Sequence, residues 1–355
     1  MTAMRVALIA SARHPISEPF AGGLEAHTWG LAHALVKRGH HVELFAAPGS
    51  DPALGARELP VRKVRLSAAA RADASMPSAR WMEEHHAYLM LMLELARDGE
   101  RRFDVVHNNS LHHLPVAMAS TLRVPVITTL HTPPTPWLES AIQTPDACPV
   151  AFTAVSAFTA SAWQPLVPAA RVVRNGVDTD FWQPGPGGDG LLWSGRLVPE
   201  KGPHLAIRAA RAAGVPLRLA GPVSDRAYFD AEVAPLLGDG AEYVGHIDRR
   251  GLAALLRESA AALVTPSWDE PYGLVVAEAL ACATPVCGFD RGALAEILTP
   301  ECGLLAPPGD VQALADLIPR VMRLDRRAAR ARAEEFCALD RTADAYTALY
   351  EEVSG

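Results

Sequence analysis

Residues 5–47 read RVALIASARHPISEPFAGGLEAHTWGLAHALVKRGHHVELFAA, which carries the clearest structural signal in the chain. A short apolar run at 5–10 precedes a helical pattern at 24–39, and a second apolar run follows at 41–47. The helical pattern ends at Gly39, and glycine commonly follows the last turn of a helix. We therefore expect two strands joined by a crossover helix, the repeating unit of a parallel α/β sheet.

The same alternation continues through the rest of the chain. Three more strand-like runs follow in the first half: DVVHN (104–108), PVITTLH (125–131) and FTAVS (152–156). The second half contributes LLWSG (191–195), LRLAG (217–221), EYVG (242–245), AALVTP (261–266), PVCGF (285–289) and GLLAP (303–307). The predicted fold class is α/β, with two Rossmann-like, doubly wound domains that face each other across a cleft.

A segment dense in glycine, proline and aspartate, RNGVDTDFWQPGPGGDG, separates the two halves. We place the linker at residues 173–187, with an N-terminal domain at 1–172 and a C-terminal domain at 188–337. A helical tail at about 338–355 is expected to pack back on the N-terminal domain. Open α/β sheets bind ligands at the carboxyl ends of their strands, so the cleft is the expected site.

Composition excludes several classes of protein. The formal net charge is −7, which gives no basic footprint for nucleic acid. No apolar run is long enough to span a bilayer, and the N-terminus lacks a secretory segment, so a cytoplasmic location is expected. The five cysteines show no CxxC spacing, which favours reduced thiols over disulfides or a zinc site.

The stretch SWDEPYGLVVAEALA, residues 267–281, places two glutamates in apolar surroundings. Pro271 suits the first turn of a helix, so Glu270 is expected at the helix N-terminus and Glu278 inside the helix. Eight helical residues span about 12 Å, so the two acids would contact different ends of an elongated ligand. The free N–H groups of Gly273 and Leu274 would provide an anion site between them. For Glu270 considered alone, a role as a cap residue is favoured, because acidic residues are common at helix starts.

Two further stretches supply what an anionic ligand needs. LLWSGRLVPEKG, residues 191–202, carries Arg196 and Lys201 near the end of a predicted strand. Arginine can bind two phosphate oxygens at once, and lysine provides a compact charge. In PFAGGLEAHTWG, residues 19–30, Gly22 and Gly23 allow the backbone to approach a ligand just before a helix begins.

Together these motifs resemble the retaining family 4 glycosyltransferases, which have the GT-B fold. The resemblance runs from residue 5 to about residue 308 and rests on the order of seven short motifs. They are GGLE (22–25), LHT (130–132), RNGVDTDFWQP (174–184), GRLVPEKG (195–202), LAGP (219–222), VGHI (244–247) and EPYGLVVAEALA (270–281).

The resemblance implies a role for each matching residue. Arg196 and Lys201 would bind the donor diphosphate, with Gly22 and Gly23 closing over it. Glu278 would bind the nucleotide ribose. Glu270, with the backbone of Tyr272, Gly273 and Leu274, would hold the hydroxyl groups of the donor sugar. The backbone of Gly245, His246 and Ile247 would line the base. His131 would lie beside the sugar and help to stabilise its developing positive charge.

The expected activity is transfer of a sugar, with retention of configuration, from a nucleoside diphosphate sugar to a hydroxyl acceptor. A UDP-sugar is the first choice of donor and GDP-mannose the second; the acceptor and the oligomeric state stay open. No cofactor or divalent metal is expected, because Asp178 and Asp180 of the DxD sequence follow an Asn-Gly turn in the linker. The alternatives are a nucleotide-sugar epimerase, another GT-B enzyme such as a glycoside phosphorylase, or a non-catalytic sugar-nucleotide binder.

Two features of the N-terminal half have no assigned role in the donor site. The adjacent histidines 85 and 86, and 112 and 113, are expected to point apart and lack metal-ligand spacing. Residues 78–103 carry a stripe of methionine and leucine, for which core packing is favoured and peripheral contact with a membrane stays open as the alternative.

Overall fold

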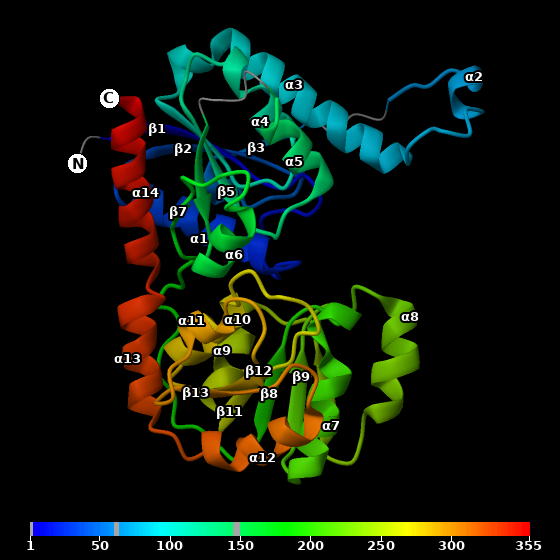
Figure 1. Ribbon diagram of the computed structural model, residues 1–355, viewed down its shortest axis with the longest axis vertical. Helices are drawn as coiled ribbons and strands as arrows, with labels where there is room; N and C mark the ends of the chain where they lie inside the picture. The colour runs from blue at the N-terminus through cyan, green and yellow to red at the C-terminus, as the bar shows by residue number, and fades with distance from the viewer. Residues whose placement is uncertain (1–2, 60–63, 145–149) are drawn as a thin grey trace.

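A computed structural model describes residues 3–59, 64–144 and 150–355. The chain forms two parallel sheets, one above the other in Figure 1. The strand orders are β3-β2-β1-β4-β5-β6-β7 and β10-β9-β8-β11-β12-β13. Two doubly wound α/β units were predicted, and the structure confirms this fold class.

The first sheet is built from the predicted runs and two additional strands. Its strands are β1 (Arg5–Ile9), β2 (His41–Ala46), β3 (Ala56–Glu58), β4 (Val105–Asn108), β5 (Val126–Leu130), β6 (Val150–Ala154) and β7 (Arg171–Val172). The longer helices of this half are α1 (Gly23–Lys37), α3 (Ala79–Arg102), α5 (Pro136–Ile142) and α6 (Ala157–Trp163). The central strands β4 and β5 are buried along their whole length, and their polar residues, such as His107 and Thr129, are buried with them.

The second sheet contains all six runs predicted for it. Its strands are β8 (Leu191–Ser194), β9 (Leu217–Ala220), β10 (Ala241–Gly245), β11 (Ala261–Val264), β12 (Val286–Phe289) and β13 (Gly303–Ala306). Its helices include α7 (Pro203–Ala213), α9 (Arg249–Arg257), α10 (Leu274–Ala281), α11 (Leu294–Ile297), α12 (Val311–Val321) and α13 (Arg326–Phe336). The short helices α8 (Arg226–Tyr228) and α2 (Ala68–Arg71) project from the second and first halves on the same side of the molecule (Figure 1).

The C-terminal helix α14 (Leu339–Ser354) leaves the second half and packs along the first (Figure 1). The Tyr346 hydroxyl lies 2.9 Å from Thr129 Oγ1 on β5, and the Tyr350 hydroxyl lies 2.6 Å from His107 Nδ1 on β4. Val177 of the linker pairs with Ala338, where the tail crosses back. These contacts agree with the domain division and tail packing predicted above, which we retain as a proposal.

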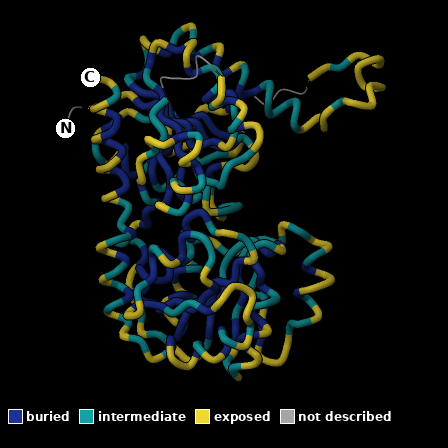
Figure 2. Tube along the Cα trace, viewed as in Figure 1, coloured by how far each residue is buried: buried dark blue, intermediate teal, exposed yellow. Residues whose placement is uncertain are grey.

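Other regions bear on the sequence predictions. The strands at the centre of each half are largely buried, whereas the segment around α2 is largely exposed (Figure 2). Cysteines 282, 287, 302 and 337 are free and buried, and Cys148 lies outside the described residues. Within the described ranges, no helix is both long and apolar enough to cross a membrane.

Candidate active site

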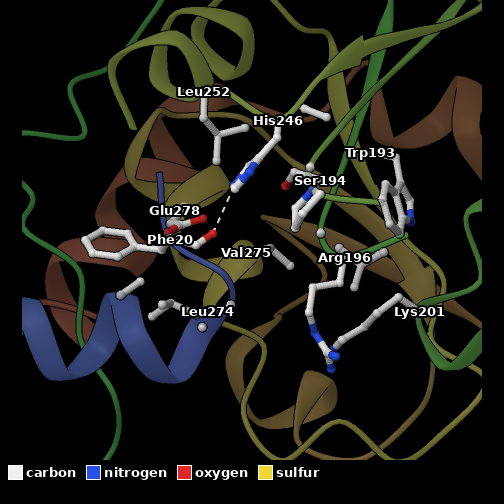
Figure 3. Close-up of a pocket in the computed structure, with 18 of the residues that line it drawn as sticks. Phe20, Trp193, Ser194, Arg196, Lys201, His246, Leu252, Leu274, Val275 and Glu278 are labelled. Atoms are coloured by element: carbon white, nitrogen blue, oxygen red, sulfur yellow. Dashed lines mark hydrogen bonds between the residues drawn. The ribbon is translucent and has the colours of Figure 1, made fainter. Parts of the chain in front are cut away.

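A cavity opens between the two sheets, where the strand order reverses at β1 and β4 and at β8 and β11. This is the position at which open α/β sheets bind ligands. Ten of the residues predicted for the site line it (Figure 3): Gly22, Gly23, Arg196, Lys201, His246, Ile247, Glu270, Gly273, Leu274 and Glu278. Three predicted residues, His131, Gly245 and Tyr272, lie outside its lining.

The two cations follow β8. Arg196 comes directly after Gly195, and its guanidinium lies 3.4 Å from the Glu200 carboxylate. Lys201 ends a short 3₁₀ helix, and its ammonium donates to Oε2 of Glu270. Both side chains lie together on one side of the cavity in Figure 3. Fixed positive charge at this place suits a diphosphate group.

The loop that carries Glu270 is held from both domains. The Pro271 carbonyl accepts hydrogen bonds from the Ser156 hydroxyl at 2.6 Å and from the Thr159 hydroxyl at 3.1 Å. The Glu270 carbonyl accepts from the Ala293 amide at 2.8 Å. The loop position therefore depends on contacts with α6 of the first domain as well as with its own domain.

The start of α10 differs from the sequence prediction. The helix begins at Leu274, and Gly273 precedes it with φ +99°, so Pro271 and Glu270 belong to a loop. The αL conformation that Gly273 can adopt ends the loop and delays the helix by one turn. The 12 Å spacing predicted between Glu270 and Glu278, which assumed continuous helix, does not apply.

Glu278 lies inside α10, as predicted. Its side chain is 9% exposed, and burial raises its pKa to about 8, although the Arg249 guanidinium nearby acts to lower that pKa. Figure 3 shows Glu278 beside Phe20 and across the cavity from Arg196. The cavity therefore has a cationic side and a side with a buried carboxyl, as an elongated, polar ligand would require.

Two helix N-termini meet at the cavity. A Cβ atom placed on Gly23, the first residue of α1, would lie 3.8 Å from Cβ of Leu274, the first residue of α10. A Cβ on Gly22 would lie 3.8 Å from Cδ of Arg196. The free N–H groups at both helix starts therefore lie close to the cations, which strengthens the anion site.

The two domains also touch at the opposite side of the cavity. The His246 ring Nε2 lies 3.0 Å from the Phe20 carbonyl oxygen, the dashed contact in Figure 3. Ile247 and Leu252 line the cavity next to it. Gly245, with φ +94°, ends β10 at a register shift and turns the chain toward His246 without lining the cavity itself.

Tyr272 and His131 are placed away from the cavity lining. The Tyr272 side chain is buried in the core of the second domain, so only its backbone belongs to the loop. The His131 ring lies 5.4 Å from the ring of His27 on α1, and its Nε2 lies 2.7 Å from Oδ1 of Asn109. Burial and the neighbouring histidines lower the pKa of His131 well below its usual value, so the ring is neutral at neutral pH.

The DxD sequence lies outside this cavity. Oδ1 of Asp178 accepts hydrogen bonds from the Asp180 amide at 2.9 Å and from the Phe181 amide at 3.2 Å, which is the turn chemistry predicted. Within the described part of the chain, no group of three or more histidine, cysteine, aspartate or glutamate residues is arranged to hold a metal ion.

Arg249 is a residue of the site that sequence reasoning missed. It begins α9, lines the cavity, and its guanidinium lies 3.5 Å from Glu18, 4.6 Å from the Trp29 ring and 3.9 Å from the Phe181 ring. These partners are far from it in sequence, and its position directly after VGHI was the only local signal. The prediction that His112 and His113 point apart was wrong, because their rings stack at 4.4 Å.

Comparison with known proteins identifies similar glycosyltransferases for both halves of the chain. Residues 21–181 match the family model described as Glycosyltransferase Family 4, and residues 183–336 match the model described as Glycosyl transferases group 1. The chain is 29% identical to a glycogen synthase of Mycobacterium tuberculosis, over 93% of this chain and 88% of the relative. It is 27% identical to a phosphatidyl-myo-inositol mannosyltransferase of Mycobacterium leprae, over 91% of this chain and 88% of the relative.

The solved structure of HepE from Anabaena in complex with UDP and glucose has a similar fold. Its TM-score is 0.74 at 16% identity, and the match covers 98% of this chain and 99% of HepE. The resemblance predicted from the motifs is confirmed by the two family models, which together span most of both domains. The chain belongs to family 4 of the glycosyltransferases, with the GT-B fold, and it uses a nucleotide-sugar donor.

Proposed function

We propose that the protein transfers a sugar, with retention of configuration, from a nucleoside diphosphate sugar to a hydroxyl acceptor and needs no divalent metal. The observation that carries the proposal is the polarity of the cavity. Arg196 and Lys201 lie on one side and Glu278 lies on the other, and the starts of α1 and α10 meet at the cavity. This arrangement suits a diphosphate and a ribose in one elongated ligand.

Each predicted residue then has a defined task. Arg196 and Lys201 bind the diphosphate and stabilise the negative charge that develops on phosphate oxygen as the bond to the sugar breaks. Gly22 and Gly23 bring the start of α1 against the same group. Glu278 binds the ribose hydroxyls.

The remaining residues act on the sugar and the base. Glu270, with the Tyr272, Gly273 and Leu274 backbone, holds the sugar hydroxyls, and the Gly245, His246 and Ile247 segment borders the base. We assign to neutral His131, which directly follows β5 and lies next to His27 of α1, the task of stabilising positive charge at the anomeric carbon. No side chain is assigned as catalytic base, because the departing phosphate can take the acceptor proton on the face where the new bond forms.

Metal independence follows from where the charges lie. Arg196 and Lys201 already provide positive charge at the proposed diphosphate position. Asp178 is engaged in its own turn and lies outside the cavity lining. We propose a UDP-sugar as donor, as named for one HepE complex, and GDP-mannose as the second choice, as named for a mannosyltransferase relative.

The test is a thermal-shift panel of UDP-, GDP-, ADP- and dTDP-sugars in EDTA, on wild type and Glu278→Ala. A ligand at 100 times its Kd stabilises the fold by about 2.7 kcal/mol, so a shift is measurable. We expect a shift for one nucleotide family that is lost in the variant. No shift with any nucleotide sugar contradicts the site, a requirement for added magnesium or manganese contradicts metal independence, and release of an epimerised donor without acceptor identifies an epimerase.

A further inference from the structure

Six aromatic rings form a stacked wall in the N-terminal domain, outside the donor cavity. The aromatic wall consists of Trp81, His85, Tyr88, His112, His113 and Trp137. The rings of Tyr88, His112, His113 and Trp137 follow one another at centroid distances of 4.2, 4.4 and 5.2 Å, with interplanar angles of 19°, 22° and 24°. Trp81 stacks on His85 at 5.1 Å and 13°.

The wall begins at the same sheet edge as the donor site. The buried Tyr88 hydroxyl donates to the Ala10 carbonyl at 2.8 Å and accepts from the Ala12 amide at 3.0 Å, directly after β1. His112 follows Asn109 by three residues, and Asn109 binds His131. The wall therefore runs outward from the carboxyl ends of β1 and β4, which is where an acceptor would have to enter.

Trp137 ends the wall at the surface. Its side chain is 58% exposed, although one side of the indole rests on His113 and the Trp81 ring lies 5.7 Å away at 41°. Exposing an indole to water forgoes the stabilisation that its burial would give. A rigid, supported ring with a free face is a binding surface for a flat or ring-shaped ligand.

The wall carries little charge. Burial and the neighbouring histidines and Arg13 lower the pKa of His112 to about 3, and burial lowers that of His113. Arg13 is paired with Glu84 at 3.2 Å. A phosphorylated acceptor would require cations here, whereas an uncharged sugar ring presents an apolar C–H face to the indole and keeps its hydroxyls in water.

A lipid would meet a different surface. Successive helical residues are separated by about 100°, so Met90, which is 46% exposed, lies on the side of α3 opposite Trp81 and His85. Leu93, which is 49% exposed, lies beside Met90, about 120° around the helix from Trp81. A membrane contact through α3 would use that apolar pair and leave the aromatic wall unexplained.

We propose that Trp137, backed by His113 and flanked by Trp81, is the acceptor subsite and that it binds an uncharged pyranoside. This proposal rests on the proposed function, since an acceptor subsite requires a glycosyltransferase. It distinguishes this chain from relatives whose names specify inositol phosphate or phosphatidylinositol acceptors.

The test uses saturation-transfer NMR with methyl α-glucoside, methyl α-mannoside and maltotetraose as probes, and myo-inositol 1-phosphate as the charged comparison. The protein is saturated with the nucleotide that gives the largest thermal shift. We expect saturation transfer to the C–H face of a neutral glycoside in wild type, with about tenfold weaker binding in Trp137→Ala and a partial loss in Trp137→Phe. Met90→Ala, a substitution of an exposed residue on the opposite side of α3, should bind as wild type does.

The outcomes separate the two proposals. A normal nucleotide shift with no glycoside signal, or with a signal unchanged in Trp137→Ala, overturns the acceptor subsite and leaves the donor site intact. Binding of inositol phosphate alone, or of phospholipid vesicles in a manner that depends on Met90, also overturns it. The absence of any nucleotide shift contradicts the proposed function itself. Trp137→Ala must keep the wild-type nucleotide shift, which shows that the variant is folded.

Discussion

The Lys201 ammonium and the Glu270 carboxylate form an ion pair within the cavity between the domains, and both side chains are largely buried, at 22% and 15% exposure. The pair neutralises the cation before a ligand arrives. A donor diphosphate would compete with Glu270 for Lys201, and Glu270 would then be free to accept from sugar hydroxyls. The free protein thus holds both groups in position without an uncompensated buried charge.

Lys201→Ala should lower kcat/KM for the donor on the order of a hundredfold, because it removes a fixed cation from the proposed site of charge development. Glu270→Ala should mainly lower kcat, with a smaller effect on donor affinity. Steady-state kinetics measures kcat and kcat/KM for both variants, and calorimetry with the nucleotide measures their donor affinity. Arg208→Ala, a half-exposed position on α7, is the matched control. Wild-type turnover in the Lys201 variant would refute its assignment.

The raised pKa of Glu278 predicts a pH-dependent stability. Its pKa is about 8 in the folded protein against an ordinary value of 4.5, so the folded protein holds a proton that the unfolded chain loses between these values. Stability should therefore fall as pH rises through this window, by at most about 1.4 kcal/mol per pH unit, with the penalty complete above pH 8. Urea unfolding of wild type and Glu278→Gln at several pH values measures how the free energy of unfolding changes with pH. Equal pH dependence in the two proteins would disprove the raised pKa of Glu278.

Arg249 should set the pH range in which donor binds. Its charge acts to lower the pKa of Glu278, and an ionised Glu278 is the better acceptor for ribose hydroxyls. Donor affinity should strengthen as pH rises toward the pKa of Glu278 in the folded protein. Arg249→Met removes the charge that lowers this pKa, so the rise in affinity should move to higher pH. Calorimetry with an intact nucleotide sugar measures it, and the exposed neighbour Arg250→Met is the control. If donor affinity depended on pH in the same way in Arg249→Met and Arg250→Met, the influence of Arg249 on Glu278 would be contradicted.

Much of the fold could be predicted because its central strands are buried on both faces. β1, β11 and β12 therefore consist of short, mainly apolar runs. The strands that were missed, β3 and β7, have three and two residues at the sheet edge, where exposure removes the apolar pattern. An edge strand of this length carries too few core positions to be distinguished from a loop.

Residues of the cavity lining could be predicted where a single motif contains both the loop and the charged side chain. Arg196, Lys201 and Glu278 are of this kind, and all line the cavity. The position of Arg249 in the cavity lining could not be predicted, because its partners Glu18 and Trp29 lie more than two hundred residues earlier in the sequence. The helix start at Leu274 was misplaced because Pro271 suggested a first turn that the αL conformation of Gly273 prevents.

Asn109 should act on the reaction through His131. Its side-chain oxygen accepts from Nε2 of His131 at 2.7 Å, which fixes the proton on that nitrogen in the neutral ring, and Asn109 Nδ2 lies 3.2 Å from His107. Asn109→Leu keeps the volume and removes the acceptor, so kcat should fall about tenfold, the effect of one lost hydrogen bond, while donor affinity is unchanged.

Asn109→Asp keeps the acceptor but adds a negative charge, which raises the pKa of His131 toward neutrality. Its kcat should therefore depend on pH near neutrality, whereas His131 should contribute no such dependence in wild type, because its pKa lies well below that range. Profiles of kcat against pH for wild type and both variants measure this difference. A purely structural role for Asn109 would lower stability in both variants without changing the shape of either profile, and that result would remove Asn109 from the reaction.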